Sequence, residues 1–227
     1  MKSFFNLSIL FAALFLVVAC GEAPKGEKAE TGEAIDASAT TETTATSDAK
    51  KYTVDASASK LYWEGTKLMG GGHKGSVNIQ SGEILVKNNE VVGGSFTIDM
   101  QSITNTDLED AEKKADLEGH LKSDDFFDVA NHPTGTFEMV KAEVVAGKPN
   151  VTHNITGNLT MKDITKSITI PVSIAMQGNK FAAKTTNFTI NRTEWGVKFH
   201  SGLVEKVKDR IINDEIGMRF EISAVAE

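Results

Sequence analysis

The sequence predicts an all-β domain, a sheet of about eight antiparallel strands that closes into a barrel. From residue 51 onward, short runs of alternating apolar and polar residues recur with Gly, Asn or Pro between them, a pattern typical of antiparallel strands. Each run has one apolar face, so the sheet either closes on itself or packs against a second sheet. We favour the barrel, because eight strands enclose an interior that side chains just fill or that holds one ligand.

The clearest strand pattern lies in residues 166–177. Side chains two residues apart point to the same face of a strand, and one face of this run is wholly apolar: Ile168, Ile170, Val172, Ile174 and Met176. Pro171 has no N–H to donate, which predicts an edge strand or a bulge at this residue. Gly178 and Asn179 then predict a two-residue hairpin turn.

Weaker patterns predict the other strands. Residues 80–83 and 88–90 are predicted to be turns, and residues 91–100 the strand that follows the second turn. The last strand alternates an apolar set with polar residues: Met218, Phe220, Ile222 and Ala224.

One helix is predicted to interrupt the strands. Residues 106–109, Thr-Asp-Leu-Glu, fit a capping box at a helix start, and Gly119 is a natural helix end. The apolar stripe of this helix is thin, so we expect it to cover the barrel rather than to build a core. Residues 202–211 are a second, weaker helical candidate, which gives one or two short helices over the mouth.

Residues 1–20 have the form of a lipoprotein signal peptide. Lys2 gives a positive start and residues 4–18 are almost wholly apolar, but this run is shorter than the ~20 residues of a membrane span. Small residues precede Cys20, which resembles a bacterial lipobox, where the cysteine becomes the lipidated first residue of the mature protein. We therefore expect a bacterial envelope protein, anchored in the membrane through acylated Cys20. Gly21 favours the outer membrane, with the domain facing the periplasm or the surface.

Residues 21–50 are predicted to be a disordered tether in front of a folded domain, residues 51–227. The tether contains no aromatic residue, and Ile35 is its only large aliphatic one, so it cannot bury enough apolar surface to offset the entropy of ordering. The formal net charge of the chain is -7. Nucleic acid is therefore a poor partner, because Lys and Arg contacts to phosphate dominate that binding.

Residues 119–138 combine two adjacent aromatic residues with acids and the start of a strand. Phe126 and Phe127 lie inside a cluster of three acids in residues 124–128, and we interpret the stretch as a lid or plug that turns into the sheet. Acid–base catalysis by this cluster would need a carboxyl group buried beside an apolar wall. We favour the alternative, in which Ser123 and the acids cap a turn and the rings pack inward.

No other motif points to catalysis or to a metal. The five histidines, His73, His120, His132, His153 and His200, lack metal-ligand spacing, and a zinc site assembled across strands is the alternative. We expect His120 to tie the lid to the barrel by hydrogen bonds. The glycines at 70–72 lack the ending of a P-loop and predict a hairpin loop. Cys20 is the only cysteine and belongs to the anchor, so we predict no catalytic residue, no metal and no enzyme.

Four blocks of sequence, in order, resemble one known family. They are residues 94–103 (GSFTIDMQSI), 119–137 (with HLKSDDFFDV and PTGTF), 156–166 (TGNLTMKDITK) and 191–197 (NRTEWGV). On the basis of these blocks, residues 51–227 resemble the YceI-like domain, a family of periplasmic lipid-binding barrels. The resemblance implies an extended, lipocalin-like antiparallel barrel whose bore holds a long isoprenoid or similar lipid. The helical insert before Gly119 and the Gly-rich loop depart from the family pattern.

The predicted function is to bind or carry an amphiphile with a long apolar tail, with this lipid as ligand and no other cofactor. Burial of apolar surface would supply the binding, at ~25 cal/mol per Å². The predicted lining, by inward parity or lid position, is Phe96, Phe126, Phe127, Phe137, Phe188 and Trp195. Trp195 fits a core position equally well. Lys74, Arg192 and Lys198 are candidates for contact with a phosphate head group.

Two alternatives stay open at this point. One is a structural or interaction module whose barrel is filled by side chains. The other is a hydrolase or isomerase that uses the acids of residues 124–128. The oligomeric state is left open.

Overall fold

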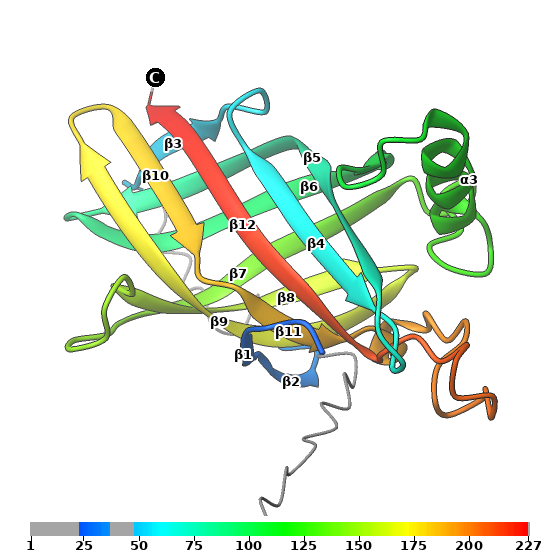
Figure 1. Ribbon diagram of the computed structural model, residues 1–227. Helices are drawn as coiled ribbons and strands as arrows, with labels where there is room; N and C mark the ends of the chain where they lie inside the picture. The colour runs from blue at the N-terminus through cyan, green and yellow to red at the C-terminus, as the bar shows by residue number, and fades with distance from the viewer. Residues whose placement is uncertain (1–22, 37–47, 227) are drawn as a thin grey trace, which may run out of the picture.

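The computed structural model describes residues 23–36 and 48–226. The predicted signal peptide and Cys20 lie outside the described residues. Within them, twelve strands form one sheet, accompanied by one α-helix and one 3-10 helix (Figure 1). The elements are β1 (Glu27–Lys28), β2 (Glu30–Glu33), β3 (Lys50–Val54), β4 (Lys60–Thr66), β5 (Gly72–Lys87), β6 (Glu90–Asn105), α3 (Ala111–Lys122), β7 (Thr134–Val144), β8 (His153–Met161), β9 (Ile164–Gln177), β10 (Lys180–Thr185), β11 (Phe188–Asn191), η1 (Arg192–Trp195) and β12 (Glu215–Ala226).

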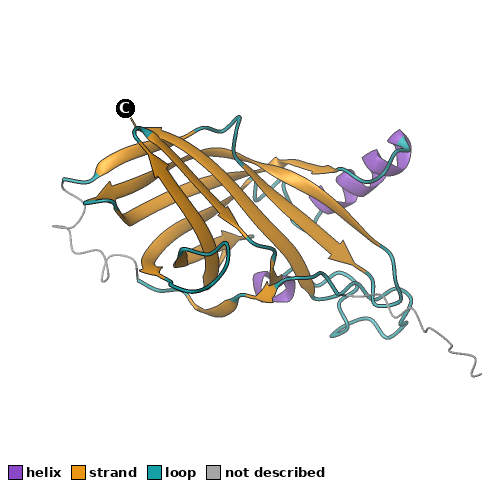
Figure 2. Ribbon diagram, turned by 60° about the vertical axis from the view of Figure 1, so that its left-hand side comes forward, coloured by secondary structure: helices purple, strands orange, loops and turns teal. Residues whose placement is uncertain are grey.

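The sheet wraps round into a barrel (Figure 2). Around the wall, β12 is followed by β10 and β11, which share one place, and then by β9, β8, β7, β6 and β5. The last place is shared by β3 and β4. The last strand closes the ring, because β12 pairs with β10 and β11 on one side and with β3 and β4 on the other. The predicted all-β barrel is confirmed. The predicted count of eight strands is wrong, since two places in the wall each hold two short strands and the N-terminal segment adds two more.

The N-terminal segment is part of the barrel wall. β1 pairs in parallel with β11, and β2 pairs in antiparallel fashion with residues 166–169 of β9, so the segment joins two strand edges that would otherwise be open. Ala29, between β1 and β2, is 3% exposed and packs into the core. The prediction of a disordered tether is therefore wrong for residues 27–33. Residues 27–33 are ordered by backbone pairing with exposed strand edges, which amino-acid composition does not reveal.

β9 changes its neighbour at Pro171. β2 pairs with residues 166–169 and β10 with residues 172–177, so the residue that lacks an N–H lies where one neighbour ends and the next begins. This local edge agrees with the prediction from Pro171. The predicted hairpin turn at Gly178 and Asn179 is confirmed, because β9 ends at Gln177 and β10 starts at Lys180.

The two turns predicted earlier in the chain have different outcomes. Asn88 and Asn89 form a turn between β5 and β6, with φ angles of 53° and 66°. The turn predicted at residues 80–83 is wrong, because β5 runs through it. A shift of register between Ile79 and Ser81 replaces the turn, and such a bulge bends a long strand without ending it.

α3 begins later than predicted. Its N-cap is Asp110, whose carboxylate accepts hydrogen bonds from the N–H groups of Glu112 and Lys113. The capping box at residues 106–109 is wrong, because the Asp107 carboxylate instead accepts hydrogen bonds from β5 and β6. The helix also continues past Gly119, and only Leu121 of it is buried. Residues 202–211 form turns and not the second predicted helix.

The hydrophobic core lies inside the barrel. The inward sets predicted on β9 and β12 are confirmed, with Ile168 at 0% and Phe220 at 3% exposure. In residues 23–36 and 48–226, no helix combines the length and the apolar character that crossing a membrane requires.

Candidate functional site

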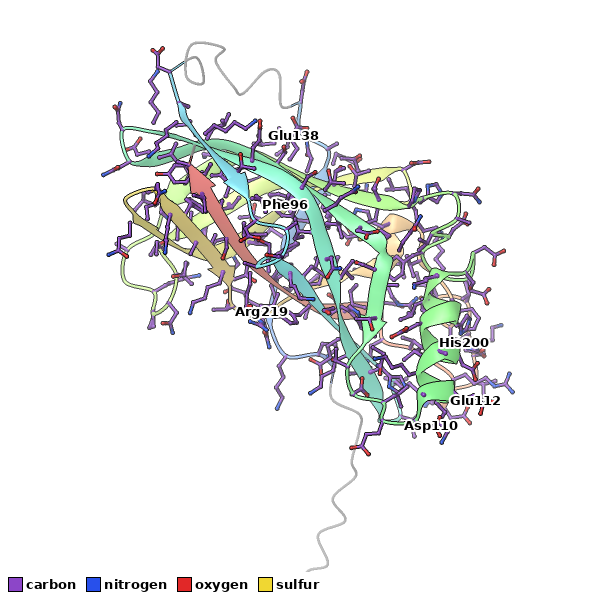
Figure 3. The ribbon with its side chains drawn as sticks, turned by 90° about the horizontal axis from the view of Figure 1, so that it is seen from above. Phe96, Asp110, Glu112, Glu138, His200 and Arg219 are labelled. Atoms are coloured by element: carbon purple, nitrogen blue, oxygen red, sulfur yellow. The ribbon has the colours of Figure 1, made fainter. Side chains whose placement is uncertain are left out.

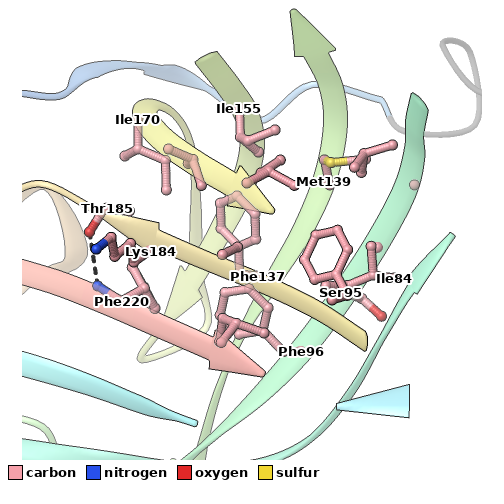
Figure 4. A pocket seen from close by; sticks show the side chains of 18 of the residues that line it. Ile84, Ser95, Phe96, Phe137, Met139, Ile155, Ile170, Lys184, Thr185 and Phe220 are labelled. Carbon is pink, nitrogen blue, oxygen red and sulfur yellow. Dashed lines mark hydrogen bonds between the residues drawn. The ribbon is translucent and has the colours of Figure 1, made fainter. Parts of the chain in front are cut away.

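The barrel interior contains two apolar cavities. Cavity A has a volume of about 80 Å³ and lies among β5, β6, β7, β8, β9, β10 and β12 (Figure 4). Its apolar side chains are Ile84, Val91, Phe96, Phe137, Met139, Ile155, Ile170, Val172, Ile174, Phe181, Ala183, Phe220 and Ile222. Its polar lining residues are Glu83, Ser95, Lys184 and Thr185. The Thr185 hydroxyl accepts the N–H of Phe220 at 2.9 Å, which satisfies that buried backbone group.

Three phenylalanines form one wall of cavity A. Phe96 and Phe137 are cross-strand partners on β6 and β7, and their stacked rings lie 5.1 Å apart. Phe220 on β12 lies 5.4 Å from the Phe96 ring. Gly157 makes room for this arrangement, because a Cβ atom there would overlap the ring of Phe137.

Cavity B has a volume of about 90 Å³ and lies at the end of the barrel beside α3. Its apolar lining is Leu61, Trp63, Val77, Ile98, Met100, Ile103, Leu121, Phe126, Phe127, Met161, Val197, Ile212, Ile216 and Met218. The indole Nε1 of Trp63 is buried and has no hydrogen-bond partner in the described part of the chain. Trp63 therefore holds an unused donor in this lining.

A packed layer separates the two cavities, which share no lining residue. On β8, Ile155 lines cavity A and Met161 lines cavity B, and Leu159 between them is fully buried. Ile168 and Phe188 are also 0% exposed and line neither cavity. The bore is thus interrupted at its middle, with apolar space on both sides.

The lid after α3 closes cavity B. Leu121, Phe126 and Phe127 all contribute to its lining, so the prediction that the two rings pack inward is confirmed. The Nζ of Lys162, in the turn between β8 and β9, donates to the carbonyl oxygen of Phe126 at 2.8 Å. Figure 3 shows α3, with Asp110 and Glu112 near its start, at one edge of the molecule and away from Phe96. The lid is therefore a cover for cavity B alone.

Glu118 fastens α3 to the sheet. Its carboxylate accepts the Thr104 hydroxyl at 2.6 Å and the Asn105 N–H at 2.8 Å. Burial alone would raise the pKa of Glu118, but these two hydrogen bonds and the nearby lysines, Lys114 first, lower it below its ordinary value. The same holds for Asp107, where hydrogen bonds from Lys74, His73 and Asn105 outweigh burial and lower the pKa.

The acid cluster in the lid has a structural role. Asp124 and Asp125 are exposed, and the Asp128 carboxylate accepts the side-chain amide of Asn131 at 3.0 Å. Phe126 and Asp128 both donate their N–H groups to the carbonyl oxygen of Ser123. This is the capped turn of the sequence prediction, and it lacks the buried carboxyl that acid–base catalysis needs.

His120 holds the lid through its ring. Its Nε2 lies 3.0 Å from the Asp125 carboxylate, inside the lid itself. The His120 ring meets Phe126 at 5.0 Å and Phe199 at 4.8 Å, both edge to face. The expected tie is therefore made by ring packing against Phe199, and the hydrogen bond stays within the lid.

The predicted lining residues separate into three groups. Phe96 and Phe137 line cavity A, and Phe126 and Phe127 line cavity B. Phe188 and Trp195 line neither cavity and are fully buried. They belong to the packed core, which corrects the prediction for these two. Trp195 donates its Nε1 to the carbonyl oxygen of Leu159 at 3.0 Å, which fixes it beside the central layer.

Several lining residues were not predicted. Phe220 lies in the inward set of the last strand, so parity alone indicates that it faces the bore. Phe181 and Ala183 alternate on β10 in the same way. Trp63 lies two residues after Leu61 on β4, so the same parity indicates that it faces the bore.

The three predicted head-group residues do not form one cluster. Arg192 is 2% exposed and donates to the carbonyl oxygens of Asn213, Val197 and Ile212. Burial lowers the pKa of Arg192, and Asp214 opposes this shift. Lys74 and Lys198 are exposed. Arg192 thus lines cavity B and supports the backbone there, apart from the two lysines, and the prediction of a shared phosphate site is not supported. No group of three or more metal-ligating side chains occurs in the residues that the structure describes.

Comparisons with known proteins identify the family. Residues 52–224 match the family model described as the YceI-like domain. A UPF0312 protein of Pseudomonas paraeruginosa is 31% identical over 135 residues, which cover 54% of this chain and 68% of the relative. A UPF0312 protein of Azotobacter vinelandii is 31% identical over 106 residues, 45% of this chain and 47% of the relative.

Two solved structures share the fold. BcnA of Burkholderia cenocepacia superimposes with a TM-score of 0.58 at 24% identity, covering 76% of this chain and 99% of the other. A polyisoprenoid-binding domain from Saccharophagus degradans gives a TM-score of 0.56 at 14% identity, covering 78% and 98%. The family match runs from β3 to β12 and leaves out only β1 and β2 of the described strands. The chain belongs to the YceI-like domain family.

Proposed function

We propose that the barrel binds the apolar tail of a long-chain isoprenoid or a similar amphiphile. The observation that carries this proposal is the pair of cavities inside the barrel, whose lining is almost wholly apolar. Concave, mostly apolar sites with a few polar groups are typical of small-molecule binding. The fold shared with a domain that is described as polyisoprenoid-binding supports the same ligand class.

The size of the cavities defines what binding requires. At about 80 and 90 Å³, each is smaller than the ~150 Å³ apolar cavity that takes up benzene. A long lipid chain therefore fits only if side chains of the central layer move aside, so that the two cavities join. Leu159, Ile168 and Phe188 are the side chains whose displacement would connect them. The proposal thus includes a rearrangement of this layer on binding.

We further propose that the protein acts in the bacterial cell envelope, anchored through acylated Cys20 and facing the periplasm or the surface from the outer membrane. The apolar run and the small residues before Cys20 support this. Cys20→Ala is expected to release the protein into the soluble fraction. Retention with the membrane fraction would refute the anchor and leave the barrel's ligand untouched.

Extraction of lipid from the purified protein tests the binding proposal. The chain from Gly21 onward keeps every described residue and is purified without detergent, and the organic extract is examined by mass spectrometry. We expect an isoprenoid or another long-chain lipid. No lipid above the level of a control preparation, together with no uptake of added polyprenyl phosphate, would refute the proposal and favour a filled-barrel interaction module.

A further inference from the structure

We propose that one end of the barrel is a membrane-contact surface for an anionic lipid bilayer. It consists of residues 67–71 and 198–211, which we call the rim loops. The two loops lie together. Leu68 donates its N–H to the carbonyl oxygen of Ile211 at 2.9 Å, and the backbone of Lys67 forms an isolated antiparallel β-bridge with that of Ile212. Figure 1 shows the second loop, in orange, at the end of the barrel where β4 finishes.

The rim loops concentrate the exposed apolar side chains of the protein. Nine large hydrophobic residues are exposed in the described part of the chain, and five of them lie here. They are Leu68 (38%), Met69 (60%), Leu203 (72%), Val204 (60%) and Val207 (49%). Scattered single residues of this kind need no explanation, but a cluster marks a contact surface.

The charge of the rim loops identifies the partner as an anionic surface. They contain the five cations Lys67, Lys198, Lys206, Lys208 and Arg210 and the two acids Glu205 and Asp209. Five against two gives a local formal charge of +3 in a chain whose net charge is -7. One of the acids is engaged within the loop, because the Glu205 carboxylate accepts the N–H groups of Lys206 and Val207 at 2.8 Å. Apolar side chains among lysines are the composition of interfacial membrane anchors.

The position of the rim loops connects this surface to the interior. Gly65 and Ile212, which border the loops, both line cavity B. Asn213 donates its N–H to the carbonyl oxygen of Thr66 at 2.9 Å and its side-chain amide to the Thr66 hydroxyl at 2.7 Å. The loops are thus fastened to the edge of cavity B, and a bilayer in contact with them would lie next to that cavity.

The N-terminal end of the described chain lies on the same side. Pro24 packs against Gly217, whose partner on β4 is Glu64, two residues before the end of that strand. Cys20 lies three positions before Ala23, and three residues of extended chain span at most ~11 Å. An acylated Cys20 would therefore hold this end of the barrel against the bilayer. This step rests on the proposed function, which includes the acylation of Cys20.

Vesicle flotation tests the surface without the anchor. The chain from Gly21 onward is mixed with vesicles of phosphatidylcholine containing phosphatidylglycerol. We expect it to float, and the combined variant Leu203→Ser, Val204→Ser, Val207→Ser to lose at least about tenfold in bound fraction. The matched control, Val144→Ser with Val225→Ser, removes exposed apolar residues elsewhere and is expected to bind like the wild type.

Two results would overturn the proposal. One is flotation of the rim-loop variant equal to that of the wild type, and the other is no flotation of the wild type at all. The lipid content of each purified protein separates this inference from the proposed function, because the substitutions leave every cavity residue in place. An empty barrel that floats refutes only the ligand proposal, and a lipid-loaded barrel that does not float refutes only the membrane surface.

An added tryptophan provides an independent readout, taken as the difference from the chain that carries only Trp63 and Trp195. In Leu203→Trp, this difference emission is expected to shift to shorter wavelength on anionic vesicles and to be quenched by brominated lipid. Val144→Trp, at the most exposed large hydrophobic residue of the described ranges, is expected to show neither change. Equal behaviour of the two variants would contradict insertion of the rim loops.

Discussion

The side-chain amide of Asn158 holds both backbone polar groups of Ile35. Its Oδ1 accepts the Ile35 N–H at 3.0 Å, and its Nδ2 donates to the Ile35 carbonyl oxygen at 2.7 Å. Asn158 lies on β8 and is 8% exposed, whereas Ile35 follows β2. An ion pair between Lys166 and Glu33 at 2.7 Å lies close by. The amide thus continues the attachment of the N-terminal segment beyond its last strand pair.

Asn158→Ala is expected to loosen the N-terminal segment. The substitution leaves the backbone groups of Ile35 without partners and lowers the free energy of unfolding by about 1–3 kcal/mol. Hydrogen exchange of residues 30–35 is expected to accelerate more than exchange of the rest of β8 and β9. Asn154→Ala on the same strand is the control, with little change expected. Unchanged exchange in the Asn158 variant would show that β1 and β2 pairing alone holds the segment.

The N-terminal segment also shows where sequence reasoning ends. Alternation on β9 and β12 predicts their inward sets because a buried face must be apolar. Residues 27–33 have no apolar face to recognise, and they are ordered by backbone groups that the edges of β9 and β11 leave unpaired. Only Pro171 hints at this, since a residue without an N–H in a central strand requires a change of neighbour.

Arg192→Met is expected to destabilise the fold. Three carbonyl oxygens beside cavity B lose their donor, which costs at least about 3 kcal/mol and lowers Tm by roughly 6–12 °C. Thermal unfolding followed by circular dichroism measures this. Arg219→Met is the matched control, because Arg219 lies on the surface over Tyr62 and is expected to cost about 1 kcal/mol or less. Equal stability of the two variants would refute a structural role for Arg192.

Acid is expected to release the lid. The pKa of Glu118 is lower in the folded protein than its ordinary value of 4.5, so its contribution to stability is complete above that pH and is lost as the pH falls through the folded value. Hydrogen exchange of α3, corrected for intrinsic rates, is expected to accelerate below pH 4.5. Asp107 is shifted in the same direction and adds to the effect.

Glu118→Ala isolates the lid attachment at neutral pH. Loss of the contacts to Thr104 and Asn105 is expected to lower the stability of α3 by about 1–3 kcal/mol and to make its exchange fast already at pH 7. Glu112→Ala, an exposed acid on the same helix, is the control and is expected to retain the wild-type profile. A Glu118 variant with slow exchange at pH 7 would contradict the account.

The candidate site was only partly predictable. Residues 119–138 signal a lid, because adjacent phenylalanines among acids need an apolar surface to cover, and both rings do line cavity B. Inward parity places Phe96 and Phe137 correctly. It does not separate a cavity wall from a packed layer, which is why Phe188, with the same parity, lies in the core. That distinction depends on how side chains from opposite walls meet.

The most direct test of a ligand inside the barrel compares two neighbouring alanines. Ala183 lines cavity A, and Ala182, the preceding residue of β10, is exposed on the outer face. Leucine at either position adds the same volume, so native mass spectrometry of the wild type, Ala183→Leu and Ala182→Leu, each exposed to polyprenyl phosphate, isolates the effect of filling the cavity. We predict a bound lipid mass on the wild type and on Ala182→Leu, and a markedly lower load on Ala183→Leu. Equal loads on all three proteins, or no load on any of them, would contradict binding in cavity A.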